Sequence, residues 1–133
     1  MEVGVTGSSG FLGSHLTNAL HQKTKFQVTT LKRNSSKKFP SINELKSFVE
    51  NLDLIYHVAG VNQGTNEEIF EGNIQATFNL LEAIRKYGNS SPRIIFTSSS
   101  QVYKKTRSPK ELVTESYKAD PATLFGVAKK TAE

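Results

Sequence analysis

Apolar residues fall into two patterns along the chain, short runs and stretches with helical spacing. The short runs predict four buried strands, at residues 1–5, 26–31, 54–60 and 93–97. Apolar positions with helical spacing follow the first run and precede the third, and they recur from about Glu67 to Tyr87, with Gly88 as a stop. A last helix is expected to open at Pro121. This alternation is typical of an α/β fold, in which crossover helices cover a parallel sheet.

The helix expected before the third strand has a sequence signal at its start. Ser41 can cap it, and Glu44 stands at the third helical position, where it would complete a capping box. The helix would turn one apolar side toward the sheet, formed by Ile42, Leu45, Phe48, Val49 and Leu52.

A glycine-spaced turn lies between the first strand and the first helix. In such a turn Gly7 permits the tight bend, Gly10 lets backbone amides approach a pyrophosphate, and Gly13 lets the helix pack closely on the strand. The positive end of the helix then faces the phosphates. The turn predicts a dinucleotide site, and the strand before it and the helix after it strengthen this prediction. We expect the same site to include Ser9, Phe11 and Leu12.

Length and composition narrow the class of protein. A chain of 133 residues with 36% hydrophobic residues suits one globular domain. No apolar run approaches the ~20 residues that cross a bilayer, and no leader precedes the first strand, so we expect a cytoplasmic protein without a membrane partner. The sequence has no cysteine, which excludes disulfides and thiolate chemistry. The net charge of +5 comes from scattered basic residues, a pattern that does not favour nucleic-acid binding.

Five segments occur in a characteristic order: Thr6–Gly13, Asp53–Gly60, Asn73–Ala83, Phe96–Tyr103 and Pro121–Lys129. Together they resemble the extended short-chain dehydrogenases/reductases, which include the NAD(P)-dependent nucleotide-sugar epimerases and dehydratases, and the UDP-sugar 4-epimerases in particular. The resemblance implies a Rossmann-type doubly wound parallel sheet in three αβα layers. It also implies a nicotinamide dinucleotide and a nucleotide sugar as partners, with hydride transfer to or from a sugar carbon. The cofactor-binding residues that it adds are Val58, Ala59, Gly60, Thr97, Ser98 and Lys129.

The resemblance places the catalytic residues at Ser99 and Lys129, but the tyrosine position is Phe125. In the family the tyrosine is the general acid/base, and the lysine four residues later lowers the pKa of its phenol and binds the nicotinamide ribose. Phenylalanine has no ionisable proton. Tyr103 or Tyr117 could substitute, although an ordinary packed or exposed tyrosine is favoured for both. Two hypotheses therefore stay open, a nucleotide-sugar oxidoreductase and a catalytically inactive dinucleotide-binding module.

The end of the second strand bears on the choice of cofactor. Members that prefer NAD carry an acidic residue there, which binds the adenosine ribose hydroxyls. This chain has Lys32 and Arg33, which can neutralise a 2′-phosphate. NADP is therefore favoured, with NAD as the alternative. The span from Arg33 to Ser41 is also too short for the family's usual third strand, so we expect a narrower sheet.

Other residues have structural interpretations. His57 is expected to be a packed histidine, and Asn73 to tie its helix to neighbouring backbone. The histidines have no partners at ligand spacing, so no metal site is expected. The chain stops at Glu133 without a helix stop signal, and by comparison with the family residues 1–133 are expected to form a truncated NAD(P)-binding domain that lacks the substrate domain. The resemblance further implies that a homodimer could form through the two helices at 67–87 and after Pro121.

Overall fold

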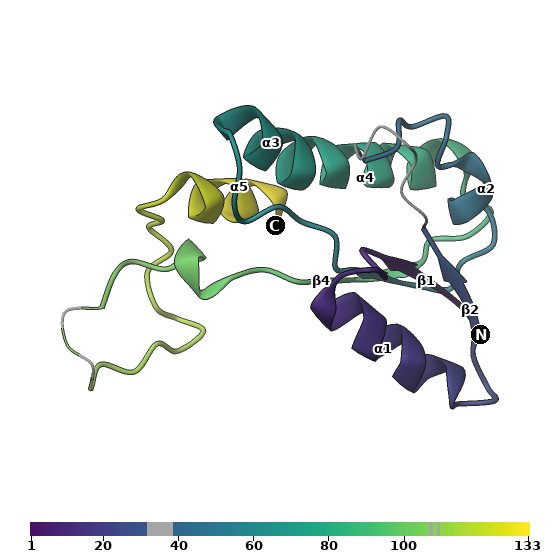
Figure 1. Ribbon diagram of the computed structural model, residues 1–133, viewed down its shortest axis with the longest axis horizontal. Helices are drawn as coiled ribbons and strands as arrows, with labels where there is room; N and C mark the ends of the chain where they lie inside the picture. The colour runs from purple at the N-terminus through teal and green to yellow at the C-terminus, as the bar shows by residue number, and fades with distance from the viewer. Residues whose placement is uncertain (32–38, 107, 109) are drawn as a thin grey trace.

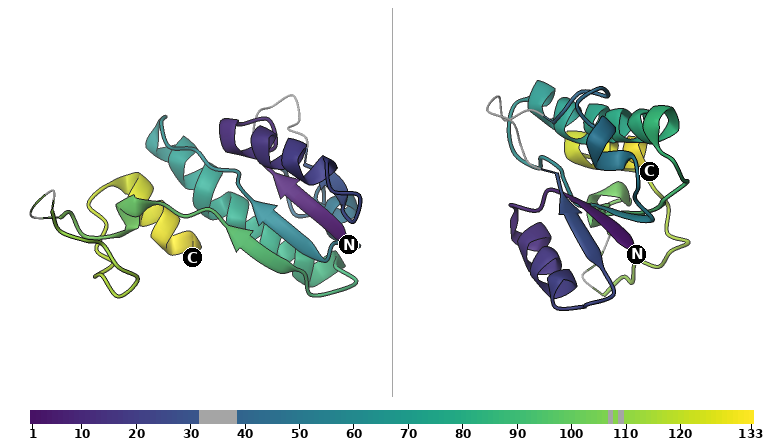
Figure 2. Two further views of the ribbon diagram at one scale, coloured as in Figure 1. Left: turned by 90° about the horizontal axis from the view of Figure 1, so that it is seen from below. Right: turned by 90° about the vertical axis from the view of Figure 1, so that its right-hand side faces the viewer.

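The computed structural model describes residues 1–31, 39–106, 108 and 110–133, and its centre is a parallel sheet of four strands. The strands are β1 (Glu2–Thr6), β2 (Gln27–Thr30), β3 (Leu54–His57) and β4 (Arg93–Phe96). They lie in the order β2-β1-β3-β4, and every neighbouring pair is parallel (Figure 2). Within the described part of the chain β2 is an edge strand, which agrees with the narrow sheet expected from the sequence.

Helices cover both faces of this sheet (Figure 1). On one face lies α1 (Phe11–His21), and on the other lie α2 (Lys46–Val49) and a long helix. The long helix consists of α3 (Asn66–Phe70), the π-helical turn η1 (Glu71–Gln75) and α4 (Ala76–Tyr87). The predicted three-layer Rossmann-type arrangement is therefore confirmed. No helix in the described ranges is long and apolar enough to cross a membrane.

Each face of the sheet has its own buried core, because successive strand residues point to opposite faces. The α1 side is filled by Val3, Val5, Leu20 and Leu54. The side under α2 and α4 is filled by Leu45, Phe48, Val49, Leu52, Ile55, Leu80 and Ala83. These clusters fix the sheet between its helices and so hold the carboxyl ends of β1 and β3 side by side.

The predicted long helix is present, but it is not a regular α-helix throughout. A capping box starts it: Thr65 Oγ1 accepts from the Glu68 N–H at 3.2 Å, and the Glu68 carboxylate accepts from the Thr65 N–H at 2.8 Å. Gly88 ends it, and its N–H donates to the Ile84 carbonyl at 2.8 Å. The π-helical turn η1 interrupts the middle and contains Asn73. Such turns are frequent at functional sites.

Two helices begin later than the sequence predicts. The Glu44 carboxylate accepts from both the backbone N–H and the hydroxyl of Ser41, at 2.8 and 2.6 Å, so the Ser41 hydroxyl donates a proton and caps no helix. Turns follow, and α2 spans only Lys46–Val49. The last helix, α5, is Leu124–Ala132. The expectation that Pro121 opens it was wrong, because the N-cap is Thr123, whose Oγ1 accepts from the Gly126 N–H at 3.0 Å.

The short 3₁₀ turn η2 (Ser100–Val102) follows β4, and the segment after it projects away from the sheet. The chain then returns, and α5 packs against α3, η1 and η2. This contact brings α5 beside the middle of the long helix and the end of β4.

Candidate functional site

The loop between β1 and α1 is shaped by its glycines. Gly7 has a φ of 70°, a left-handed conformation that favours glycine, and a Cβ there would lie 2.7 Å from the backbone nitrogen of Ala59. A Cβ on Gly13 would lie 2.1 Å from the Gly7 carbonyl oxygen. The start of α1 therefore packs directly on the loop, whereas the sequence predicted that Gly13 lets the helix pack closely on the strand. Gly10 is the N-cap and makes no side-chain cap, so the first amides of α1 are available to an anion.

The other residues predicted for this loop lie on its outside. Ser9 is exposed, and Phe11 and Leu12 on the first turn of α1 are 86% and 54% exposed. Phe11 stacks on His15, with their ring centroids 4.8 Å apart.

A second group of residues meets at the end of β3. A Cβ on Gly60 would lie 2.9 Å from both Asn73 Oδ1 and Lys129 Nζ, so these two polar atoms face the same glycine. Asn73 Nδ2 donates to two backbone carbonyls at 2.7 and 2.8 Å, which confirms its expected structural role. Its buried Oδ1 has no hydrogen-bond partner within the described residues. Lys129 is 4% exposed, its Nζ donates to the Thr97 carbonyl at 3.1 Å, and burial lowers its pKa.

Phe125 stands one helical turn before Lys129 on α5. The Lys129 ammonium lies 5.8 Å from the centroid of the Phe125 ring and 4.8 Å from that of Phe96. Both are cation–π contacts, which help to hold an ammonium away from water. The ring at position 125 thus lies beside the lysine but offers no proton to transfer.

The two serines after β4 have different partners. Ser99 is the N-cap of η2, and its Oγ accepts from the Gln101 N–H at 3.1 Å. Ser98 Oγ donates to the carboxylate of Glu133 at the end of the chain. That contact, together with the nearby Lys130, lowers the pKa of Glu133.

His57 is buried at the end of β3 and is hydrogen-bonded at both ring nitrogens. Its Nδ1 lies 2.7 Å from Thr6 Oγ1 and its Nε2 lies 3.0 Å from Thr77 Oγ1. Burial, and then the charge of Lys129, lowers the pKa of His57 to about 4. The expectation of a packed histidine is confirmed. The sequence did not link Thr6 or Thr77 to His57, because these contacts depend on the register of β1 and β3 and on the position of α4.

Lys32 and Arg33 lie outside the described residues, and the two candidate tyrosines stay apart from this site. Tyr103 and Tyr117 pack on each other in the projecting segment, with ring centroids 6.3 Å apart, and the Tyr117 hydroxyl donates to Glu111 at 2.9 Å. Neither contact links these tyrosines to Lys129.

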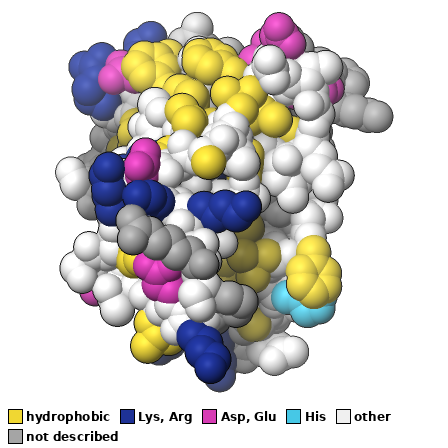
Figure 3. Space-filling view, turned by 90° about the vertical axis from the view of Figure 1, so that its left-hand side faces the viewer, with side chains coloured by type: hydrophobic (Ala, Val, Ile, Leu, Met, Phe, Trp, Pro, Cys, Tyr) yellow, Lys and Arg dark blue, Asp and Glu magenta, His cyan; other side chains and the backbone are white. Residues whose placement is uncertain are grey.

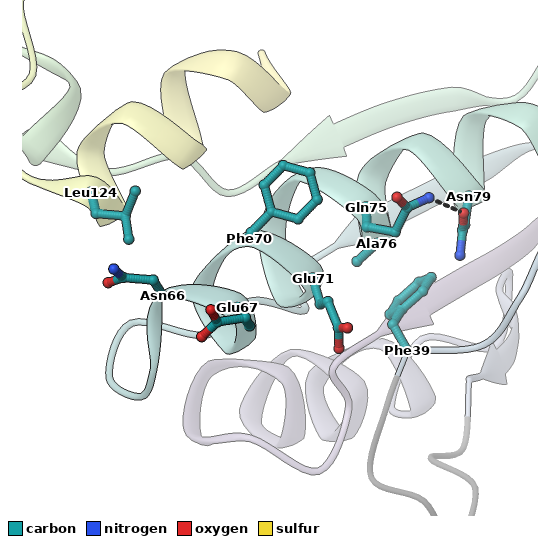
Figure 4. Close-up of a pocket in the computed structure, with 9 residues that line it drawn as sticks. All are labelled: Phe39, Asn66, Glu67, Phe70, Glu71, Gln75, Ala76, Asn79 and Leu124. Carbon is teal, nitrogen blue, oxygen red and sulfur yellow. Dashed lines mark hydrogen bonds between the residues drawn. The ribbon is translucent and has the colours of Figure 1, made fainter.

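A cavity of about 600 Å³ lies along α3 and α4 (Figure 4). Its walls are mixed, with apolar side chains from Phe39, Phe70 and Leu124 and carboxylates from Glu67 and Glu71. None of its lining residues belongs to the predicted dinucleotide site. The cavity is therefore separate from the glycine loop and from the cluster of Gly60, Asn73 and Lys129.

The sequence profile of the NAD dependent epimerase/dehydratase family matches residues 3–133. The chain belongs to this family. It is 36% identical, over 76% of its length, to the UDP-2-acetamido-2,6-beta-L-arabino-hexul-4-ose reductase of Pseudomonas aeruginosa. It is 31% identical, over 100% of its length, to an uncharacterized UDP-glucose epimerase of Bacillus subtilis. The chain spans 26% of the first relative and 50% of the second.

Several solved structures have the same fold as this chain. A UDP-galactose 4-epimerase superposes with a TM-score of 0.80 at 26% identity, and the match covers 100% of this chain and 49% of that one. The UDP-glucuronic acid 4-epimerase of Bacillus cereus in complex with NAD gives a TM-score of 0.81 at 24% identity, over 99% and 49% of the two chains. RMD from Pseudomonas aeruginosa complexed with NADPH superposes with a TM-score of 0.80 at 24% identity, and the match covers 98% of this chain and 46% of that one. Proteins with this fold have thus been solved both with NAD and with NADPH.

Proposed function

We propose that this chain binds a nicotinamide dinucleotide across the carboxyl ends of β1 and β3. The observation that carries the proposal is the position of two groups on neighbouring strands. The glycine loop follows Thr6 and the Gly60 cluster follows His57, and these two strand ends pair in the sheet. In open α/β sheets, ligands bind at the carboxyl ends of the strands.

The residues present fit such a ligand. The loop from Gly7 to Gly13 offers backbone amides and a helix N-terminus to a pyrophosphate. The unpartnered Asn73 Oδ1 and the Lys129 ammonium offer one acceptor and one donor to the hydroxyls of a ribose. Val58, Ala59, Thr97 and Ser98 would line the space between these two ends. When bound, the dinucleotide supplies the nicotinamide ring that accepts or gives a hydride.

NADP is the dinucleotide that we propose, because Lys32 and Arg33 follow the second strand and no acidic residue stands there. NAD is the alternative. A guanidinium and an ammonium attract a 2′-phosphate, whereas the acid typical of members that prefer NAD would repel it.

Phe125 favours binding without efficient turnover. A family reaction on a nucleotide sugar needs a proton to enter or leave a sugar oxygen, and the ring beside Lys129 cannot supply it. Ser99 and Lys129 support the alternative, a nucleotide-sugar epimerase, dehydratase or reductase. The chain spans 26% and 50% of the two relatives named above, so the nucleotide sugar is part of the proposal.

Calorimetric titration with NADP(H) and NAD(H), beside an activity screen with nucleotide sugars, tests both parts. We expect binding, tighter for NADP(H), and no appreciable turnover. Gly10→Ala is the test variant: its Cβ would lie 3.3 Å from the Gly7 carbonyl oxygen, a tight contact that needs a small shift of the loop, and urea unfolding checks that the variant is folded. It should weaken binding at least ~10-fold by crowding the pyrophosphate. Absence of binding to either dinucleotide would refute the binding function, and a kcat near ~10 per second would refute the inactive alternative.

The long helix and α5 also support a homodimer. They expose large apolar side chains at Phe70, Phe78, Leu81, Leu124 and Val127. Figure 3 shows hydrophobic side chains gathered at the top of one face of the molecule, where α3 and α5 lie. A second copy of the chain, acting in the cytoplasm, is the partner we propose for this surface. Sedimentation velocity should show a dimer that Phe78→Glu converts to a monomer, and a monomeric parent chain would contradict the proposal.

A further inference from the structure

The hydrogen bonds around His57 have only one consistent set of directions. The Thr77 hydroxyl donates to the Asn73 carbonyl at 2.7 Å, so its proton is used and its oxygen must accept from His57 Nε2–H. A neutral ring then has a bare Nδ1, which accepts from the Thr6 hydroxyl. The Thr6 oxygen in turn accepts from the Ala59 N–H at 3.2 Å. His57 is therefore the centre of a directed chain of hydrogen bonds from Ala59 to Asn73.

This series of hydrogen bonds joins both sides of the proposed site. At one end, Ala59 touches the glycine loop, since a Cβ on Gly7 would lie 2.7 Å from its nitrogen and 2.8 Å from its Cα. At the other end, Asn73 Nδ2 donates to the Val61 carbonyl at 2.7 Å. Ala59 is thus linked to His57 through Thr6, and Val61 is held by Asn73, whose backbone carbonyl accepts the last hydrogen bond of the series. Gly60, which lies between Ala59 and Val61, faces the Lys129 ammonium.

The surroundings of His57 keep the ring neutral. The rings of Phe39 and Phe96 flank it, with centroids 6.0 and 5.6 Å away. Thr6 and Thr77, which contact it from β1 and α4, do not titrate, and the charged group that acts on it is the ammonium of Lys129 on α5. A protonated ring would also point an N–H at Thr6 Oγ1, so the Thr6 proton would lose its acceptor. Burial and the Lys129 charge together place its pKa at about 4.

We propose that His57 is a positioning residue for the dinucleotide, which in its neutral Nε2–H form fixes the glycine loop and the 58–61 segment relative to the long helix. The inference rests on the proposed function, and it adds a buried residue that acts through Thr6 and Thr77. Sites that are held in place before a ligand arrives bind it more tightly, because less ordering accompanies binding.

Nitrogen NMR of the imidazole tests the geometry without any dinucleotide. We expect His57 to show a protonated Nε2 and a bare Nδ1, and to keep that form from about pH 7 down to about pH 5, because burial and the Lys129 charge lower its pKa to about 4. Amide exchange supplies a second readout, since the Ala59 N–H should be protected through Thr6. The opposite tautomer, or an Ala59 amide that exchanges as fast as an exposed loop amide, would overturn the proposal.

Substitutions then connect the geometry to binding. His57→Gln keeps one acceptor and one donor on its amide and cannot titrate, so it should bind NADPH within about threefold of the parent. His57→Leu is apolar and of similar size, and it should weaken NADPH binding about tenfold and speed exchange at Ala59. Thr77→Ser should behave like the parent, and Thr77→Val like His57→Leu. These two keep the test decisive even if His57→Leu fails to fold.

Two control variants separate positioning from general stability. Ile55→Val removes one methyl group from the core on the same strand, and His21→Gln changes an exposed histidine on α1. Both should leave NADPH affinity unchanged. Equal affinity of His57→Leu and the parent, or a loss with His57→Gln as large as with His57→Leu, would overturn the positioning role. If the parent chain binds no dinucleotide, the proposed function fails, and the tautomer and the Ala59 exchange still decide whether His57 holds this segment.

Discussion

Acidification from about pH 7 to about pH 4 is expected to destabilise the folded chain by about 3 kcal/mol through His57 alone. The pKa of His57 falls from 6.5 to about 4 on folding, because the ring is buried and close to Lys129. Below pH 6.5 the His57 imidazole is protonated in the unfolded chain but stays neutral in the folded chain until the pH approaches 4. The contribution of His57 to the unfolding free energy is therefore complete above that pH. It is about 2 kcal/mol lower near pH 5, and it is fully lost once the pH is below about 4.

Urea unfolding of the parent and of His57→Gln across this pH range measures the effect. The Gln side chain does not titrate, so the difference in unfolding free energy between the two chains isolates His57 from the carboxylates. Glu82 and Glu133 also have lowered pKa values and cost stability as they take up protons at low pH, but they are present in both chains. We expect the parent to lose about 2 kcal/mol more than the variant between about pH 7 and pH 5. Parallel curves for the two chains would refute the buried neutral histidine.

Three further predictions concern single residues. Phe125→Tyr should do little in this chain. In a chain extended to carry a substrate pocket it should raise hydride transfer at least ~100-fold, measured as NADPH formation with nucleotide sugars. No gain despite bound cofactor and sugar would mean that position 125 is not the position of the general acid. Arg33→Asp should weaken NADP binding ~10-fold to 100-fold more than NAD binding in a titration, and equal losses would mark Arg33 as solvated surface. Gly126→Ala should lower the unfolding free energy by about 1 to 3 kcal/mol, because its Cβ would lie 2.3 Å from the Gln101 carbonyl oxygen; a more stable variant in urea unfolding would show that α5 can shift.

Local patterns in the sequence predicted the sheet and the glycine loop. Strand runs and helical spacing act over a few residues, so β1 to β4, α1 and the long helix followed from them. The tight bend at Gly7 was predicted for the same reason, and the close approach at Gly13 was predicted too, although its partner is the loop and not the strand. The start of α5 was misplaced because Pro121 and Thr123 are both suitable helix starts, and the cap on Gly126 decides between them.

The parts of the site that join distant elements could not be predicted. The π-helical turn around Asn73 leaves no distinctive pattern in the residues. The contacts of His57 with Thr6 and Thr77 depend on the pairing of Thr6 with His57 in the sheet and on the height of α4 above it. The burial of Lys129 depends on how α5 docks beside Phe96. These features come from tertiary packing, which a single sequence does not show.

The central claim is that a dinucleotide lies across the carboxyl ends of β1 and β3. Amide NMR shifts recorded during titration with NADPH test it most directly. We predict the largest changes at Gly7–Gly13 and Val58–Gly60, with little change at Phe70 and Leu124 beside the separate cavity. Changes that centre on that cavity and spare the glycine loop would contradict the account.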